Sequence, residues 1–195
     1  MSAGKAWVVV AAFALAGGAA SAADLEAGKS KAALCEACHG PGGNSIIPAN
    51  PSIAGQPAQF IATALYFFRE GNRKDPQMTP IASTLSNADM NDLAAYFSSL
   101  KMAPPRHKSS PENAAAGPDL TKKFMCTQCH GPALVGVQHI PRIAGQQPDY
   151  LKTQLLGFKA QKRADIDGNM TSAAQALGEK DIEALVDYLA GLSVP

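Results

Sequence analysis

The sequence predicts an all-α protein built from two tandem copies of one small domain, which a proline-rich linker joins. Three observations carry this prediction. Segments of the first half recur about 90 residues later, apolar residues recur at helical spacing, and no run alternates apolar and polar residues as a strand would. The chain of 195 residues is long enough for two small domains.

Three short segments of the first half return in the second half. They are Cys-x-x-Cys-His-Gly-Pro at 35–41 and 126–132, Ile-Ala-Gly-Gln at 53–56 and 143–146, and Met-Thr at 78–79 and 170–171. The offset is 91, then 90, then 92 residues. It changes only in stretches rich in glycine, proline and polar residues, where loops absorb differences in length.

Each copy is expected to contain three principal helices. In the first copy a short helix begins near Ala27 and leads into the cysteine motif. A second helix starts after Gln56, with Pro57 in its first turn, where proline is tolerated. A third starts at Ser86, because Asp89 three residues later resembles a capping box. Apolar stripes at helical spacing follow each start and are expected to pack on one another.

Composition divides the chain into four parts. They are a signal peptide at 1–23, a first domain at 24–103, a linker at 104–116 and a second domain at 117–195. The leader has Lys5, an apolar run and small residues before a cleavage point, as secretory signals do. A retained membrane anchor is the alternative, although the apolar run is short for a bilayer.

The charge and composition exclude some classes of protein. The net charge of +1 leaves no strong basic field, so a nucleic-acid-binding protein is not expected. The 46% of apolar residues is an ordinary globular value, but only 6% of residues are aromatic. A buried macrocycle would supply apolar area that two such small domains otherwise lack.

The two cysteine motifs predict covalent attachment of two haem c groups. In this chemistry each pair of thiols forms thioethers to one haem, and the next histidine becomes an iron ligand. The thioether residues are Cys35, Cys38, Cys126 and Cys129, and the axial histidines are His39 and His130. Three alternatives remain open: a zinc site, a redox dithiol of the thioredoxin type, and structural disulfides.

Met78 and Met170 are the expected second axial ligands of the two irons. They match each other in the repeat and fall in loops just before the third helices, where a thioether could reach the iron. Met90 and Met125 are expected to be packing residues, and Met102 lies at the linker edge. His139, in a loop after the second motif, is a minor alternative ligand.

Other residues near the motifs have supporting roles in this interpretation. A backbone carbonyl near Pro51 or Pro141 could accept the imidazole N–H of the axial histidine. His107, in the linker, is expected to be solvated. Basic residues at matching places could neutralise haem propionates or be solvated loop charges; they are Arg73, Lys74, Lys162 and Arg163.

Together these motifs resemble the dihaem cytochromes c of the cytochrome c4 family. The resemblance covers about residues 24–195 and rests on the Cys-x-x-Cys-His-Gly motifs, the Ile-Ala-Gly-Gln segments, the paired methionines and the third helices. It implies two class I cytochrome c domains related by a pseudo-twofold axis, with His/Met ligation of both irons. One departure is visible: the leader at 117–125 looks short, which predicts an abbreviated first helix in the second domain.

The resemblance also implies a function. It predicts a periplasmic one-electron carrier, soluble or loosely attached to the membrane, that exchanges electrons with membrane cytochrome complexes and passes them towards a terminal oxidase. A dihaem subunit of a flavocytochrome, such as a sulfide dehydrogenase, is the alternative. A haem peroxidase is less favoured, and the chain has no spare cysteine for the axial ligand of a haem thiosulfate dehydrogenase.

Overall fold

The computed structural model describes residues 22–194, and within this range the chain is helical. The first half contains α1 (Leu25–His39), the short 3-10 helix η1 (Pro41–Gly43), α2 (Ala58–Arg69), α3 (Met78–Ala82) and α4 (Asn87–Ser99). The second half contains α5 (Pro111–Lys123), α6 (Cys126–His130), α7 (Pro148–Lys159), α8 (Asn169–Gln175) and α9 (Glu179–Gly191). The only β feature among these residues is an isolated bridge between Val137 and Ile140, so the all-α prediction is confirmed.

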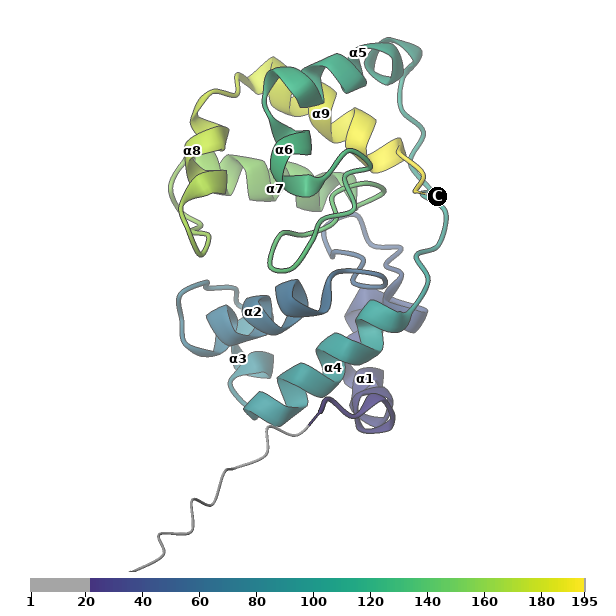
Figure 1. Ribbon diagram of the computed structural model, residues 1–195, viewed down its shortest axis with the longest axis vertical. Coiled ribbons are helices and arrows are strands. Elements are labelled where there is room, and N and C mark those ends of the chain that lie inside the picture. The colour runs from purple at the N-terminus through teal and green to yellow at the C-terminus, as the bar shows by residue number, and fades with distance from the viewer. Residues whose placement is uncertain (1–21, 195) are drawn as a thin grey trace, which may run out of the picture.

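The two halves form separate lobes, one holding α1 to α4 and the other α5 to α9 (Figure 1). The chain between α4 and α5 passes along one side of both lobes. Each lobe has its own apolar core, centred on Leu93 and Phe97 in the first and on Leu185 and Leu189 in the second. The predicted signal peptide at 1–23 falls outside the described residues except for its last two positions.

Side-chain caps set the starts of several helices where the sequence predicted them. The carboxylate of Asp24 accepts hydrogen bonds from the backbone N–H groups of Glu26 and Ala27, so α1 begins two residues before the predicted position. Ser86 and Asp89 form the predicted capping box at the start of α4. Such caps satisfy N–H groups that have no partner within the helix.

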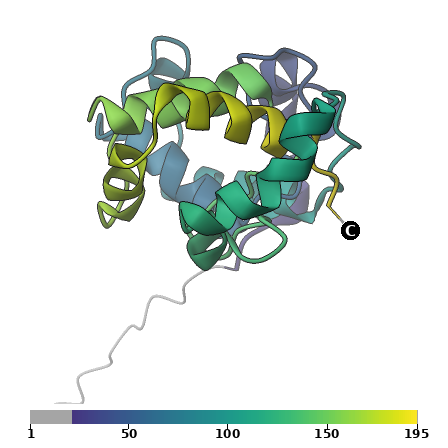
Figure 2. The ribbon, with the colours of Figure 1, turned by 90° about the horizontal axis from the view of Figure 1, so that it is seen from above.

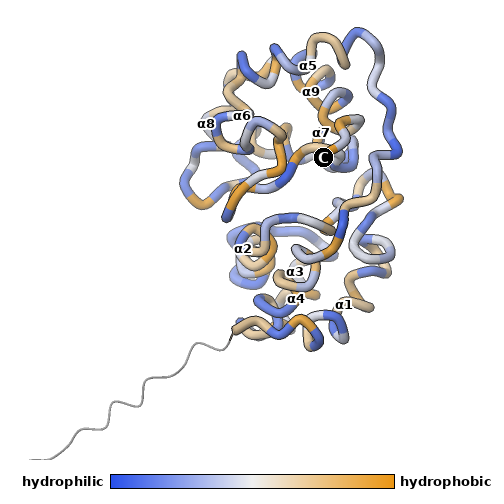
Figure 3. The backbone as a smooth tube through the Cα atoms, turned by 45° about the vertical axis from the view of Figure 1, so that its right-hand side comes forward, coloured by the Kyte–Doolittle hydropathy of each residue, from blue (hydrophilic) through white to orange (hydrophobic). Residues whose placement is uncertain are grey.

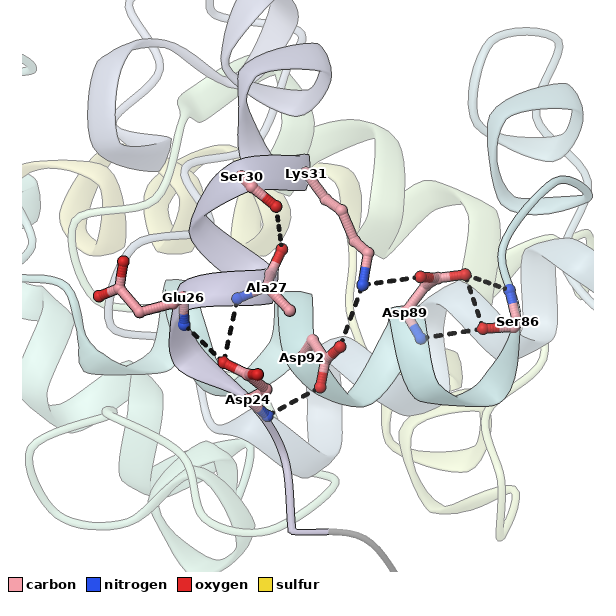
Figure 4. Close-up of polar contacts among 8 residues, drawn as sticks. All are labelled: Asp24, Glu26, Ala27, Ser30, Lys31, Ser86, Asp89 and Asp92. Carbon is pink, nitrogen blue, oxygen red and sulfur yellow. Dashed lines mark hydrogen bonds and ion pairs between the residues drawn. The ribbon is translucent and has the colours of Figure 1, made fainter.

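Helices α1 and α4 cross closely, and a cluster of polar contacts joins their N-terminal turns (Figure 4). Lys31 Nζ lies 2.8 Å from Asp89 Oδ1 and 3.1 Å from Asp92 Oδ2. Hydrogen bonds to Asp89 and Asp92 raise the pKa of Lys31, and the bond from Lys31 lowers the pKa of Asp89. The crossing needs Gly28, because a Cβ there would lie 2.2 Å from the backbone oxygen of Asp92.

The equivalent crossing in the second lobe, between α5 and α9, depends on Gly117 (Figure 2). The predicted abbreviation of this first helix is wrong. α5 spans 13 residues, begins at Pro111 inside the predicted linker, and ends at Lys123, and two residues later Met125 has a φ of 57°. Gly28 lies seven residues before the first cysteine of its motif, whereas Gly117 lies nine residues before its own. The interruption of the helix between α5 and α6 accommodates these two additional residues.

We expect Gly117→Ala to destabilise the second lobe strongly. A Cβ at this position would lie 2.1 to 2.5 Å from ring atoms of Tyr188, and overpacking of this kind lowers the free energy of unfolding by about 3 kcal/mol. Urea unfolding followed by circular dichroism measures the change. Gly157→Ala is the matched control, because its Cβ would meet only an ordinary contact at 3.5 Å and alanine favours the helix by about 0.5–1 kcal/mol. Equal stability of the two variants would contradict the role of Gly117.

The lobes are joined by a reciprocal set of buried hydrogen bonds that follows the repeat. The amide of Gln56 donates to the backbone oxygen of Arg142 (3.0 Å) and accepts from its backbone N–H (2.9 Å). Gln146 does the same with Ser52, at 2.8 and 2.7 Å. Ser52 and Arg142 are equivalent positions in the repeat, and so are Gln56 and Gln146, each at an offset of 90 residues. The two pairs of bonds are therefore related to each other by the pseudo-twofold axis.

The segment before α5 is fastened to α9 through Asp187. Its carboxylate accepts hydrogen bonds from His107 Nε2 (2.6 Å), from the backbone and hydroxyl of Ser110 (2.9 Å each) and from Asn113 (2.8 Å). The prediction of a solvated His107 is therefore wrong. Burial alone would raise the pKa of Asp187, but these hydrogen bonds outweigh it and hold the pKa far below its usual range.

Removing this carboxylate by Asp187→Ala is expected to lower the free energy of unfolding by about 2 kcal/mol at pH 7, the scale of hydrogen bonds to a charged group. The folded-state pKa is depressed, so the contribution exists above the unfolded pKa of about 3.9 and is lost as pH falls below it. Thermal unfolding at pH 7 and pH 3 should show the difference between wild type and variant shrinking at the lower pH. The exposed Asp119→Ala serves as control; a pH-independent difference would refute the explanation.

In the described part of the chain, no helix is both long enough and apolar enough to cross a bilayer. Figure 3 shows apolar and polar stretches interspersed within the helices of both lobes. The helices thus have the pattern of amphipathic elements that cover small cores.

Candidate haem sites

In the first lobe, α1 carries the cysteine motif in its last turn and brings His39 into the interior. The imidazole is buried, and its Nδ1 lies 2.8 Å from the backbone oxygen of Pro51. A carbonyl only accepts, so Nδ1 carries the proton and Nε2 keeps its lone pair for a metal. Burial lowers the pKa of His39 although the Pro51 carbonyl opposes this change, so the ring is neutral and suited to ligation.

The second lobe reproduces this geometry. His130 ends α6, is equally buried, and its Nδ1 lies 2.7 Å from the backbone oxygen of Pro141. Burial again lowers the pKa of the imidazole. The prediction that a carbonyl near each of these prolines accepts the imidazole proton is confirmed, and such bonds fix the orientation of ligating histidines.

The thiols fit covalent attachment better than the three alternatives. All four cysteines are free, so the disulfide alternative is wrong. Among the described residues no three His, Cys, Asp or Glu side chains gather to hold a metal ion, which argues against a zinc site. Burial raises the pKa of Cys35 and of Cys126, whereas a redox dithiol of the thioredoxin type needs a lowered one.

Met78 and Met170 lie in matching places, but in short helices rather than in the expected loops. Met78 is the first residue of α3 and packs, with Cys35, against the core cluster of the first lobe. Met170 is half-buried in the first turn of α8. A methionine is therefore present in each lobe in addition to the buried histidine, as a second ligand would require.

The other candidates take different places. Met90 is buried in the core, as predicted, but Met125 is more than half exposed, so the prediction that it packs is wrong. The reason is the break before α6, which turns Met125 outward in a left-handed conformation. His139 Nε2 lies 3.7 Å from Asp167 Oδ2, which gives this imidazole a carboxylate partner.

Arg73 and Arg163 are the two arginines among the basic residues that could neutralise the propionate groups of haem. Each guanidinium lies 4.4 Å from a ring centroid, over Phe68 and Phe158 respectively. Both donate to the side chain of Gln154, and Arg73 also donates to the Tyr150 hydroxyl. Lys74 and Lys162 are exposed by contrast.

Spare donor capacity remains in this arginine pair. Among the described residues, the buried Nε of Arg163 has no hydrogen-bond partner. Burial lowers the pKa of Arg163 to about 10, and the positive charge of Arg73 adds to that effect. An unpaired buried donor on a cation is suited to a carboxylate, so Arg163 fits a propionate group of haem.

Sequence reasoning missed the groups that join the lobes. The sequence shows Gln56 and Gln146 only as the last residues of the repeated Ile-Ala-Gly-Gln segments, and the buried Arg142 has only Ser52 at its repeat position. The Arg142 guanidinium donates to the backbone oxygens of Ala54 and Ala144, one in each lobe. The one available signal was the repetition of glutamine at both positions.

A helical pair of lobes, each with two thiols, a neutral buried imidazole and a methionine at a repeated position, defines a dihaem cytochrome c. Comparisons with known proteins agree. Residues 114–193 match the family model "Cytochrome c", and residues 23–97 match "Cytochrome C oxidase, cbb3-type, subunit III".

Three known proteins are similar over most of their length. Cytochrome c4 of Thiocapsa roseopersicina is 39% identical over 182 residues, which cover 87% of this chain and 93% of the relative. A thiosulfate dehydrogenase electron acceptor of Thiomonas intermedia (strain K12) is 34% identical over 185 residues, covering 88% and 84%. The crystal structure of reduced recombinant cytochrome c4 from Pseudomonas stutzeri matches with a TM-score of 0.81 at 35% identity, covering 88% of this chain and all of that one.

The chain belongs to the cytochrome c4 family. It consists of two class I cytochrome c domains, binds two covalently attached haem c groups, and transfers electrons. The family resemblance inferred from the motifs is confirmed.

Proposed function

We propose that this protein is a periplasmic one-electron carrier, not an enzyme, that accepts electrons from membrane cytochrome complexes and passes them towards a terminal oxidase. Loose association with the membrane is part of this proposal. When bound, haem c supplies an iron that gains and loses one electron.

The chain supports this function by how it holds the two histidines. Pro51 and Pro141 hold the proton of each imidazole at Nδ1, and burial keeps both rings neutral. We infer that Met78 and Met170 are the second ligands, and that Cys35, Cys38, Cys126 and Cys129 form the thioethers. A thioether ligand raises the reduction potential.

The single observation that carries the proposal is the repetition, in each lobe, of a half-buried methionine at the start of a short helix together with a buried histidine. A second protein ligand closes the position at which an enzyme would bind substrate, whereas a carrier needs no open position.

A redox titration of the purified mature protein with optical spectra tests this proposal. We expect two haems c per chain, two one-electron transitions and low-spin spectra in both oxidation states. A five-coordinate high-spin signal in the oxidised protein would instead indicate an open site and a peroxidase-like enzyme.

A second candidate concerns the electron donor. The similarity to a thiosulfate dehydrogenase electron acceptor over most of both chains favours a donor of that kind. Mixing the oxidised protein with a thiosulfate dehydrogenase and thiosulfate in a stopped-flow instrument should reduce both haems within the turnover time of the enzyme. If the thiosulfate dehydrogenase reduces the protein slowly but a terminal oxidase oxidises it rapidly, the result would favour a respiratory carrier and count against a thiosulfate dehydrogenase as its donor.

A further inference from the structure

Each of the two matched methionines is held at its backbone by an aspartate from the preceding loop. Asp75 Oδ1 accepts hydrogen bonds from the backbone N–H groups of Met78 (2.8 Å) and Gln77 (2.9 Å). Asp165 Oδ2 accepts from the backbone N–H of Met170, also at 2.8 Å. The N-cap positions of α3 and α8 carry no side-chain cap of their own, so these carboxylates satisfy N–H groups of the methionine turns.

The contact persists although the two loops differ in length. Asp75 and Asp165 are 90 residues apart, but the methionines are 92 apart, so the second loop has two additional residues. The carboxylate lies three residues before the methionine in one copy and five before it in the other. A contact that merely followed from local sequence spacing would change with such an insertion, yet the same carboxylate reaches the same N–H at the same distance.

We propose that Asp75 and Asp165 are positioning residues that hold the backbones of Met78 and Met170 and thereby keep each thioether at its iron. The proposal rests on the ligand roles proposed above for these methionines. A carboxylate is the stronger acceptor for such N–H groups, because hydrogen bonds to charged groups exceed neutral ones. Loss of the carboxylate would let the methionine turn away from the iron more often.

The two aspartates use their oxygens differently, and this difference makes a sharp test possible. Among the described residues, the Asp75 carboxylate accepts only through Oδ1. Asp165 uses both oxygens, because Oδ1 also accepts from the backbone N–H (3.1 Å) and the hydroxyl (2.6 Å) of Thr171. Asparagine keeps one carbonyl oxygen and replaces the other by an NH₂ donor. Asp75→Asn therefore retains its acceptor. In Asp165→Asn the new NH₂ group faces the backbone N–H of either Met170 or Thr171, so one of these two hydrogen bonds is lost.

Imidazole added to the oxidised holoprotein tests how readily each methionine leaves. It competes for the position that the thioether holds, and the Met-to-ferric-iron charge-transfer band reports the loss of methionine. We expect Asp165→Asn, Asp165→Ala and Asp75→Ala each to lower the apparent dissociation constant of imidazole about tenfold at one haem, which corresponds to about 1.4 kcal/mol. Asp75→Asn should stay within about twofold of wild type, as should the exposed control Asp119→Ala.

The haem of the unchanged lobe is an internal check of folding in every variant. If Asp165→Ala does not fold, the comparison of Asp165→Asn with Asp75→Asn carries the test alone, and equal affinities for imidazole would overturn the proposal. Met170→Ala separates the two inferences. If the whole band persists in Met170→Ala, the ligand role of Met170 is wrong. If about half of the band is lost there but the aspartate variants leave the affinity for imidazole unchanged, only the positioning role is wrong.

Discussion

Replacing Cys126 and Cys129 together by alanine is expected to yield a protein that carries one haem instead of two. Without thiols in the second lobe no thioether forms, and ligation by His130 and Met170 without a covalent link retains haem weakly. The first lobe has its own core and its own motif, so its haem should remain. Intact-protein mass and haem content per chain, measured after export, give the result.

The mirror variant of Cys35 and Cys38 is the matched control. It should lose the other haem and leave the second lobe loaded, so that the spectra of the two variants add up to the wild-type spectrum. Retention of two haems by either double variant would show that the motifs are not the attachment sites, and loss of both haems by each would show that the lobes do not load independently.

Met78→Ala is expected to remove about half of the Met-to-ferric-iron charge-transfer band and to lower the potential of one haem, because methionine ligation raises the potential. The other half of the band belongs to Met170 in the same molecule. Optical spectra of the oxidised protein and a redox titration measure both effects.

Met102→Leu is the control for this variant, since it removes a methionine with a side chain of similar volume at the linker edge. It should leave the whole band in place. A complete band in Met78→Ala would mean that another group ligates the first iron, and the His/Met assignment in that lobe would then be wrong.

Much of the site could be predicted because covalent haem attachment uses a short contiguous motif. Cys35, Cys38 and His39 lie within five residues, and their copies lie within another five, so no tertiary information is needed to group them. The methionines could be paired only through the repeat. Their short helices were missed, because the runs that begin at Met78 and Asn169 are too short to show a helical period.

Packing in the cores shows why local pattern is not sufficient. Gly43, with a φ of 73°, has no room for a Cβ, which would lie 2.9 Å from the ring of Phe97. The second lobe has Leu134 and Leu189 at the matching positions, and both are buried in its core. Leu189 on α9 is smaller than Phe97 on α4, and the space that this leaves is filled by Leu134. The residue at 43 or 134 is therefore explained by the side chain that packs against it, and not by its neighbours in sequence.

The sequence by itself determined the helical class, the twofold repeat, the paired cysteine motifs and the starts of α2 and α4, because each of these depends on residues a few positions apart. Only the tertiary structure decided how the lobes meet and what holds the methionines. The Gln56 and Gln146 bonds to the opposite lobe, the tie of His107 to Asp187 and the reach of Asp165 around a longer loop join groups brought together by folding. Hydrogen bonds depend on distance and direction in space, and no spacing along the chain specifies them.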